Sequence, residues 1–329
     1  MSPSILIAGG YGFVGGQFAT MLRAAAPQAR IQLAGRNPET GADLAARLGA
    51  TTCRLDLTRP LDLDLEGVDL IVATVHDRAD RLVEAAIARG IAHIGITRLA
   101  GDVAPTTFAA LRQPPARPVV LAGHWQAGVL TQVAAHAAAA FARVERVDLV
   151  AVWDERDPVG AMSAADGDSF LGPALVRSAG TWSWVDAESA ARRVHLDAGV
   201  EADGVPVGVL DVPSLAAITG APEVRFDLVL APSIGSRAGG AASHDVIVDL
   251  EGVLIDGSRG RRRWLATDPA GNGHMTAAGV AVLAGRILGT DGAAPAQGGL
   301  HTPDTLVPAS AAIEQWQRAG IVIREVVHA

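Results

Sequence analysis

Short apolar runs alternate with helical stretches over the first 125 residues of the chain. The runs are brief and rich in Val, Ile and Leu, as buried parallel strands are. They are Ser4–Ala8, Ile31–Ala34, Thr51–Leu55, Val68–Thr74, Ala92–Ile96 and Pro118–Ala122. Helices are predicted after the first run, through about Arg23, and over Arg81–Arg89. This alternation predicts an α/β domain with a Rossmann-type, doubly wound parallel sheet.

From Val144 onward the pattern changes to longer strand-like runs separated by loops. They are Val147–Trp153, Val194–Leu196, Val205–Val212, Val224–Leu230, His244–Ile255 and Arg261–Ala266. The last two are joined by Asp256–Gly260, a glycine-containing link typical of a hairpin. The pattern predicts an α+β domain built on a mostly antiparallel sheet. Helices are predicted over 128–141, Thr276–Leu288 and Ile313–Arg318.

A glycine-rich stretch lies between the first predicted strand and the first helix. It contains the pattern G-x-G-x-x-G as Gly10, Gly12 and Gly15. In this pattern one glycine makes a tight turn, one lets the backbone approach a pyrophosphate, and one lets helix pack on strand. The helix N-terminus then offers free N–H groups to the phosphates. The predicted cradle consists of Gly9, Gly10, Tyr11, Gly12, Phe13, Val14 and Gly15. The alternative is a glycine turn without a ligand.

The end of the second predicted strand bears on the choice of dinucleotide. Arg36 lies where NAD-specific domains place an acidic residue, about 20 residues after the last glycine of the pattern. An arginine there offers a cation to a 2′-phosphate instead, so NADP(H) is predicted and NAD(H) is less favoured. Asn37 follows it, and Asp56, after the third strand, is predicted to contact the adenine. Arg36 at a strand end could also be an ordinary surface residue.

Ligands of such sheets bind at the carboxyl ends of the strands. Thr74, Val75 and His76 follow the fourth predicted strand, and Arg98 and His124 follow the fifth and sixth. The sequence contains no lysine, and its one tyrosine, Tyr11, lies in the phosphate loop. Proton transfer therefore falls to another group, and the pKa of histidine is near neutral pH. We predict His124 as the first candidate acid and His76 as the second, with His76 also a possible cofactor contact and Arg98 a carboxylate or ribose contact.

Four of the six tryptophans follow closely on the last strand of the predicted Rossmann domain. They are Trp125, Trp153, Trp182 and Trp184. Aromatic residues make up 4% of the chain, so this clustering predicts a hydrophobic wall of a substrate pocket. Ordinary packing in the core of the second domain is the equal alternative.

Composition excludes several other classes. The net charge of −8 offers no basic surface for nucleic acid, and we interpret Arg261–Arg263 as a solvated hairpin. No apolar run reaches the about 18 residues of a membrane span, and no signal peptide is recognised. A single cysteine, Cys53, which is expected to pack rather than react, fits a reducing compartment, so the cytoplasm is expected.

Two rival chemistries have weaker sequence support. Gly167–Phe170 resembles a GDS-type esterase motif but lies in the middle of the chain, and no G-x-S-x-G elbow exists. The nine histidines lack metal-ligand spacing, and the acidic stretch Asp154–Asp157 is interpreted as a solvated loop, so no metal site is predicted.

Five stretches together resemble the saccharopine-dehydrogenase-like NAD(P)-dependent reductases. They are ILIAGGYGFVGG, AGRNPE, VDLIVAT with LVEAAIARGIAHIGIT, VVLAGHWQAGVL, and DPAGNGHMTAAGVAVLAGRIL ahead of GLHTPDTL. The resemblance implies a dinucleotide-binding domain over 1–126 and an inserted domain for substrate binding and dimerisation over 127–272. It also implies that a C-terminal segment, 273–329, returns to the Rossmann domain. The chain departs from the family at GHWQAG, which lacks the usual proline, and in the loop Val75–Arg78.

These observations predict an NADP(H)-dependent oxidoreductase that acts as a homodimer. It would transfer hydride to or from a C=N or C=O bond of a small amino-acid-like or hydrophobic molecule. A dinucleotide-binding sensor or regulatory protein without catalytic activity is the alternative.

Overall fold

The computed structural model describes residues 2–160, 172–196 and 199–326, in two compact units. Unit 1 consists of Met1–Gly123 and Thr276–Val307, and unit 2 of His124–Met275 and Pro308–Ala329. The boundaries expected at 126/127 and 272/273 therefore lie at 123/124 and 275/276. The C-terminal segment is divided, because its last strand pairs with a strand of unit 2 and only its first part belongs to unit 1. The esterase-like stretch Gly167–Phe170 lies outside the described residues.

Unit 1 is built on a seven-stranded sheet whose order is β15-β6-β5-β4-β1-β2-β3. Every pairing in it is parallel. The strands are β1 (Ser4–Ala8), β2 (Arg30–Gly35), β3 (Thr51–Arg54), β4 (Leu70–Ala73), β5 (Ala92–Gly95), β6 (Pro118–Leu121) and β15 (Gly299–His301). The first six match the predicted apolar runs. The seventh, β15, is too short and too polar to be recognised from its sequence.

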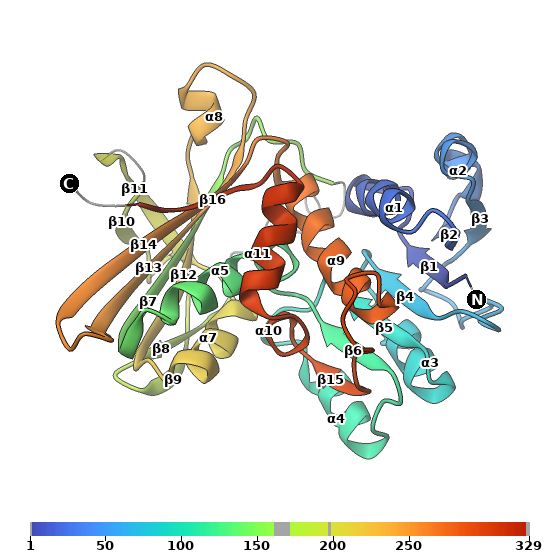
Figure 1. Ribbon diagram of the computed structural model, residues 1–329, viewed down its shortest axis with the longest axis horizontal. Coiled ribbons are helices and arrows are strands. Elements are labelled where there is room, and N and C mark those ends of the chain that lie inside the picture. Colours follow the sequence, from blue (N-terminus) through green and yellow to red (C-terminus); the bar gives the residue numbers. More distant parts are fainter. Residues whose placement is uncertain (1, 161–171, 197–198, 327–329) are drawn as a thin grey trace. The chain divides into compact units, whose positions relative to one another are not determined.

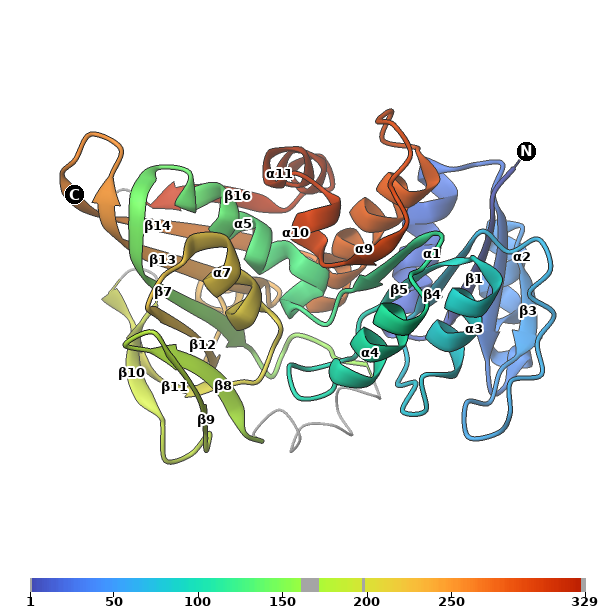
Figure 2. The ribbon, with the colours of Figure 1, turned by 90° about the horizontal axis from the view of Figure 1, so that it is seen from below.

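Helices cover both faces of this sheet, which makes it doubly wound. One face carries α1 (Phe13–Ala25), α2 (Ala42–Leu48) and α9 (Asn272–Leu288), and the other carries α3 (Arg81–Arg89) and α4 (Ala104–Arg112) (Figures 1 and 2). Two short helices, η1 (Pro38–Gly41) and α10 (Pro303–Leu306), complete the unit. Side chains of β1 such as Leu6 are fully buried between the layers. Cys53 packs at the edge of this core, and burial raises its pKa to about 11, so its thiol packs as predicted.

Unit 2 is built on a nine-stranded, mostly antiparallel sheet. Its main order is β10-β11-β12-β7-β13-β14-β16, with β8 on β12 and β9 on β8; β12 and β7 pair in parallel. The strands are β7 (Phe141–Trp153), β8 (Ala174–Ser178), β9 (Thr181–Val185), β10 (Arg192–His195), β11 (Glu201–Pro206), β12 (Glu223–Leu230), β13 (His244–Leu254), β14 (Arg259–Asp268) and β16 (Val322–Val326). The predicted fold class is thereby confirmed for both sheets.

One face of this sheet is covered by helices. These are α5 (Val129–Ala138), α7 (Asp211–Thr219) and α11 (Ala309–Arg318), while the short helices η2 (Trp125–Gly128) and α8 (Ile234–Arg237) lie in connections (Figure 1). The half-buried His136 of α5 packs edge-on against Trp264 of β14, with 5.0 Å between ring centroids. No helix in the described part of the chain is both long and apolar enough to cross a membrane.

The strand predicted over Val205–Val212 is wrong in its second half. β11 ends at Pro206 and α7 begins at Asp211. The chain turns at Gly208, where an added Cβ would lie 2.9 Å from the carbonyl oxygen of Pro173. Pro213 is compatible with the first turn of α7 because the N–H groups there have no intrahelical acceptor.

The interpretation of Arg261–Arg263 as a solvated hairpin is also wrong for its last residue. Arg261 and Arg263 share one face of β14, because side chains alternate along a strand. Arg263 is 7% exposed and binds both carboxylate oxygens of Asp249, and it donates to two backbone carbonyls of the β10 region. Arg262, on the other face, is half-buried and pairs with Glu325.

Candidate functional site

The glycine turn after β1 is shaped by backbone contacts that exclude side chains. Gly9 has φ +80°, and an added Cβ would lie 2.6 Å from both Thr74 Oγ1 and Val75 Cγ1. At Gly15 an added Cβ would lie 2.2 Å from the carbonyl oxygen of Gly9. Gly9 therefore permits the turn, and Gly15 permits α1 to approach it.

The outer side of the same turn is open. An added Cβ at Gly12 meets only the Gly9 carbonyl, at 3.1 Å, so little of the protein lies over this residue. Gly12 precedes α1, whose first turn has no acidic residue and no side chain that caps it. The first N–H groups of a helix have no partner within it, and they carry the positive end of the helix dipole. Phe13 and Val14 lie at this terminus, partly exposed. The cradle thus fits the pyrophosphate of a dinucleotide.

Tyr11 joins the turn to the end of β2. Its hydroxyl accepts a hydrogen bond from the backbone N–H of Asn37, at 3.0 Å. The Tyr11 side chain lies against Gly35 and Gly41. An added Cβ at Gly35 would lie 2.2 Å from the hydroxyl oxygen, and one at Gly41 would lie 2.5 Å from a ring carbon. Burial raises the pKa of Tyr11. Arg36, on the same loop, is exposed and forms no hydrogen bond or ion pair with the described residues. Its guanidinium is available to a ligand.

Asp56, predicted to contact adenine, is engaged locally. Its Oδ1 accepts from the N–H of Thr58 at 3.1 Å and from the Thr58 hydroxyl at 2.7 Å. These hydrogen bonds hold the pKa of Asp56 below its usual range. Arg59 lies 3.6 Å from its other oxygen. Asp56 therefore shapes the turn that follows β3.

Two of the predicted contacts at the ends of β4 and β5, Thr74 and Arg98, bond to other groups of unit 1. The Thr74 hydroxyl donates to the carbonyl of Ala8 at 2.9 Å and is buried beside Gly9. His76 is half-buried in the loop that follows. Arg98 donates to the carbonyl of Asp77 at 2.6 Å and forms an ion pair with Asp80. The charge of Arg98 is thus compensated within unit 1, which leaves it less suited to bind a carboxylate than predicted.

His124 and Trp125 begin unit 2, and both are buried. His124 is 4% exposed, and its Nε2 lies 2.8 Å from the hydroxyl of Ser214 on α7. The backbone N–H of Trp125 donates to Asp211 at 2.7 Å, and its ring packs on Phe226, with 5.1 Å between centroids. The ring of His124 thus bonds to a neighbouring helix of unit 2, and its role as the acid stays a prediction.

The four tryptophans do not form one wall. Trp125 is in the core, and Trp153, at the end of β7, is half-buried. Trp182 and Trp184 are 44% and 53% exposed on β9, which pairs only with β8 among the described strands. They share one face, as their spacing predicts, and the guanidinium of Arg177 lies 5.5 Å from the Trp182 ring centroid.

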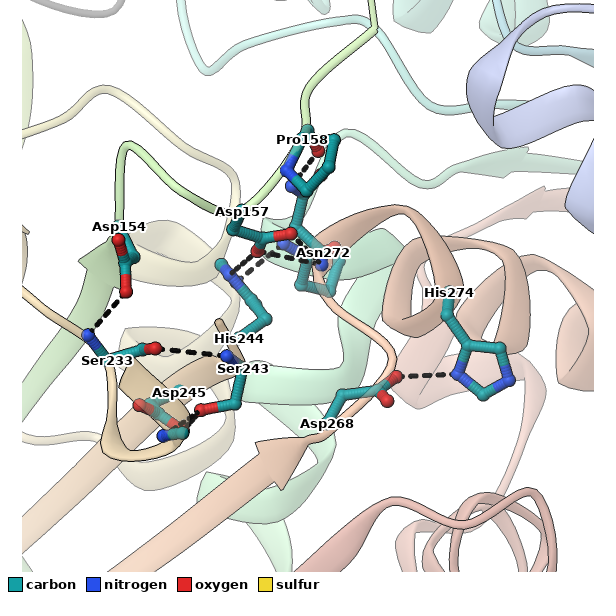
Figure 3. A network of polar contacts seen from close by, with 12 residues as sticks. Asp154, Asp157, Pro158, Ser233, Ser243, His244, Asp245, Asp268, Asn272 and His274 are labelled. Carbon is teal, nitrogen blue, oxygen red and sulfur yellow. Dashed lines mark hydrogen bonds and ion pairs between the residues drawn. The ribbon is translucent and has the colours of Figure 1, made fainter. Parts of the chain in front are cut away.

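The acidic loop after β7, predicted to be solvated, is instead a buried centre of hydrogen bonds (Figure 3). Asp154 is 5% exposed and accepts from the N–H groups of Arg156 and Ser233, at 2.9 and 2.8 Å, and from the Ser236 hydroxyl. Burial acts to raise its pKa, but these hydrogen bonds outweigh it and hold the pKa below its usual range. Asp154 thereby anchors the start of α8.

Asp157, in the same loop, holds the start of α9. Its carboxylate accepts from the backbone N–H of Asn272 at 2.9 Å (Figure 3). Its other contact is His244, whose Nδ1 lies 3.5 Å away. The Nε2 of His244 accepts from the indole N–H of Trp125 at 3.0 Å. Because an indole N–H only donates, the proton of His244 is on Nδ1, toward Asp157. The side-chain amide of Gln126 also lies 2.7 Å from this Nε2.

Gln126 and Ala127 have the left-handed φ values +54° and +53°, which residues with a Cβ rarely adopt. The contact between the side-chain amide of Gln126 and His244 holds Gln126 in this conformation. Such strain persists only where the surroundings impose it, and it is common at functional sites.

One acid–base pair in this region was missed by sequence reasoning. Asp268, at the end of β14, is 1% exposed, and its Oδ2 lies 2.7 Å from Nδ1 of His274 in the first turn of α9 (Figure 3). The hydrogen bond to Asp268 raises the pKa of His274, against the opposing effect of burial. The detectable signal was an Asp that closes a strand followed by a His in the first turn of the next helix.

No protein-family model matches the chain, and no curated protein matches it in sequence. Apo saccharopine dehydrogenase (L-Glu forming) from Saccharomyces cerevisiae has a similar structure, with a TM-score of 0.70 at 12% identity over 99% of this chain and 100% of that one. An oxidoreductase from Agrobacterium radiobacter, in complex with NAD+, L-tartaric acid and magnesium, gives a TM-score of 0.49 at 14% identity over 98% of each chain. GenD2 from gentamicin A biosynthesis, in complex with NAD, gives a TM-score of 0.48 at 18% identity over 99% of this chain and 97% of that one. The first similarity confirms the predicted resemblance at the level of the fold: the chain has the fold of saccharopine dehydrogenase.

Proposed function

We propose that the protein is an oxidoreductase that binds a nicotinamide dinucleotide on unit 1. It transfers hydride to or from a C=N or C=O bond of a small amino-acid-like or hydrophobic molecule. The observation that carries this proposal is the glycine turn, which is closed to side chains at Gly9 and Gly15 and open at Gly12. The dinucleotide-bound neighbours named above are consistent with it, and the fold shared with saccharopine dehydrogenase supports chemistry on an amine or imine.

Dinucleotide binding is tested by a substitution that fills the open side of the turn and leaves its backbone conformation unchanged. Gly12→Ala places a methyl group where the pyrophosphate would lie, and the backbone there, φ −79° and ψ −179°, accepts any residue. We expect affinity for NADPH to fall by about tenfold or more, which corresponds to about 1.4 kcal/mol. The fluorescence of bound reduced nicotinamide measures it.

The matched control is Gly16→Ala, one turn further along α1. Its methyl group would lie 3.3 Å from the end of the Leu44 side chain and 3.9 Å from the Gly10 carbonyl oxygen, an ordinary contact distance. It should retain wild-type affinity and melting temperature. Equal affinity in Gly12→Ala and wild type would overturn the assignment of the cradle.

Turnover separates an enzyme from a sensor. We expect the protein to oxidise NADPH in the presence of some members of a panel of 2-oxo acids, cyclic imines and apolar ketones. The absorbance of reduced nicotinamide follows the reaction. Tight binding of NADPH with no oxidation by any compound would favour the regulatory alternative.

We further propose a preference for NADP(H), supported by the exposed and unengaged Arg36. A charge-assisted hydrogen bond to a 2′-phosphate contributes about 1.5–3 kcal/mol, so NADPH should bind about tenfold to a hundredfold more tightly than NADH. Arg36→Ala should remove most of this difference in affinity between NADPH and NADH. Arg47→Ala replaces an exposed arginine on α2 and should leave the difference in affinity unchanged. Equal dissociation constants for the two dinucleotides in the wild type would exclude the preference.

A homodimer remains a proposal that rests on the second unit. The exposed Trp182 and Trp184 lie on β9, whose second edge pairs with no described strand. An exposed apolar edge of this kind favours association. Light scattering should give twice the 33.7 kDa mass of the chain, and a monomer at micromolar concentration would contradict it.

A further inference from the structure

We propose that two copies of the chain associate through the free edge of β9, with the two β9 strands antiparallel about a two-fold axis at Ser183. This inference rests on the homodimer proposed above and names the strand and the register that form its interface. The residues that it uses all lie in the β8–β9 hairpin of unit 2.

The edge of β9 lacks the features that keep edge strands from pairing. Natural sheets protect an edge with charged side chains, proline or a bulge. β9 has the sequence TWSWV, with no charge and no proline, and it pairs with β8 without a shift in register. Four of its five residues are exposed, and it pairs with no described strand other than β8 (Figure 2). This edge is therefore open to another strand.

The two ends of the main strand order have the protection that β9 lacks. β10, at one end, carries Arg192, Arg193 and His195 among its four residues. β16, at the other end, carries Arg324 and Glu325. Charges of this kind disfavour pairing with a second chain. Of these three edges, β9 is the one without a charged residue, and so the one suited to association.

The turn of the hairpin determines which backbone groups face the free edge. Ala179 and Gly180, which form the turn, have φ +48° and +77°, as in a type I′ turn. The residue that follows such a turn, here Thr181, directs its N–H back across the hairpin. Hydrogen-bonded and non-hydrogen-bonded pairs alternate along an antiparallel ladder. The N–H and C=O groups of Trp182 and Trp184 are therefore directed away from β8, toward the free edge.

A two-fold axis at Ser183 provides partners for all of these groups. Trp182 then lies opposite Trp184 of the partner subunit, and each such pair exchanges both of its hydrogen bonds. An axis at Trp182 would place Trp184 opposite the turn at Gly180, and an axis at Trp184 would place Trp182 opposite Asp186, beyond the end of β9. The axis at Ser183 is thus the one that pairs both tryptophans within the strand.

The same register brings the tryptophan rings together. A two-fold axis perpendicular to a sheet keeps each face on its own side, so the rings of both copies lie on one face. Trp182 and Trp184 are 44% and 53% exposed in the single chain, and directly opposed aromatic side chains on a sheet attract each other. Because each chain has one β9, the association closes at two copies.

The first experiment places a thiol on the axis. In this register Ser183 faces its own copy as a non-hydrogen-bonded pair, with the Cα atoms about 4.5 Å apart. This separation lies within the range that a disulfide can bridge. Ser183→Cys should therefore form a covalent dimer under mild oxidation, which is measured by electrophoresis without reductant.

Thr181→Cys is the matched control, on the same face of the same exposed strand. Thr181 would lie opposite Val185 of the partner subunit, so the two introduced thiols would be about 14 Å apart, too far for a disulfide. It should form no more covalent dimer than the wild type, whose one cysteine, Cys53, is half-buried in unit 1. Equal cross-linking in the two variants would overturn the register.

The second experiment tests the opposition of Trp182 and Trp184 by charge. Trp182→Lys with Trp184→Lys places like charges opposite each other across the axis, and Trp182→Glu with Trp184→Lys places opposite charges there. We expect the second double variant to dimerise at least about fivefold more tightly than the first, as measured by analytical ultracentrifugation. The exchanged variant, Trp182→Lys with Trp184→Glu, should match it, which separates the effect from the charge of the nearby Arg177. Loss of the dimer in all three variants would support β9 as the interface, and a dimer of wild-type affinity in all three would overturn it.

The outcomes separate this inference from the proposed function. A monomeric wild type at micromolar concentration would overturn the homodimer and, with it, this interface. A wild-type dimer in which Ser183→Cys forms no disulfide would overturn the interface at β9 alone. Neither result changes the proposed binding of a dinucleotide, which Gly12→Ala tests.

Discussion

The glycine turn of unit 1 and the aspartate network of unit 2 are built in opposite ways. The turn is one continuous stretch, Gly9–Gly16, whose shape follows from its own backbone and the ends of the neighbouring strands β2 and β4. The network joins residues far apart in the chain: Asp154 bonds to Ser233, 79 residues away, and Asp157 to Asn272, 115 residues away.

The two regions also differ in what they leave unsatisfied. The carboxylates of the network accept backbone and hydroxyl donors of the protein itself, so they stabilise the fold. The turn leaves the N–H groups at the start of α1 uncommitted, so its polar groups are available to a ligand. A substitution in unit 2 should therefore act mainly on stability, and one in the turn mainly on binding.

The largest loss of stability should come from breaking a buried ion pair in unit 2. Arg263 binds Asp249 through two nitrogens, and both residues are 7% exposed. Arg263→Ala leaves a buried carboxylate without its main partner, which typically costs about 3–5 kcal/mol of unfolding free energy. Urea denaturation measures this loss.

Arg261→Ala is the matched control, on the same face of the same strand. Arg261 also contacts Asp249, at 3.0 Å, but its side chain is 40% exposed. An exposed pair contributes about 0–1 kcal/mol. Equal losses in the two variants would show that burial does not decide the contribution of these arginines, and the comparison of the two regions would fail.

The turn is one continuous stretch and the network joins distant residues, and this difference explains how much of the structure could be predicted from the sequence. The parallel sheet and its phosphate turn were predictable because each depends on residues adjacent in the chain. Six of the seven strands of unit 1 match predicted apolar runs, and the glycines have a fixed spacing. The strand β15 was missed because only three residues, Gly299–His301, enter the sheet.

The site in unit 2 was not predictable in the same way. Burial of Asp154 and Asp157 depends on α8 and α9, which no local pattern places beside them. His124 follows a strand as predicted, yet its ring contacts α7, a helix that the sequence pattern did not predict and whose first two residues fall within the predicted strand Val205–Val212. Only Asp268 and His274 are close in sequence, and their pairing needed the turn at Gly271 to be known.

The next largest effect on stability should come from Asp211, whose contribution to the unfolding free energy depends on pH. Burial raises the pKa of Asp211 to about 6, although Thr131 and the N–H of Trp125 donate to its carboxylate. A folded-state pKa above the unfolded value means that this group stabilises the fold fully below about pH 4 and loses that contribution as the pH rises through about 6. A shift of this size corresponds to roughly 2–3 kcal/mol.

Asp211→Asn isolates that contribution, because the amide does not titrate and its oxygen can still accept from Trp125. The unfolding free energy of wild type minus that of Asp211→Asn should fall by roughly 2 kcal/mol between pH 4.5 and pH 8. Other carboxylates titrate in both proteins and cancel in the difference. A difference that rises with pH would mean that the hydrogen bonds outweigh burial at Asp211, as they do at Asp154.

The smallest effect should be seen at Tyr11, where the turn meets the end of β2. Tyr11→Phe removes one hydrogen bond, from the N–H of the exposed Asn37, which water can then satisfy. The stability loss should therefore be about 0.5–1.5 kcal/mol. Because Arg36 is adjacent to Asn37, release of this loop should also weaken NADPH binding by a few-fold while NADH binding changes less. Thr58→Ala removes one exposed hydrogen bond after β3, from the Thr58 hydroxyl to Asp56, and should cost similar stability without changing the ratio of affinities. If both variants change that ratio equally, the link from Tyr11 to Asn37 is not what positions Arg36, and the turn is independent of the strand end beside it.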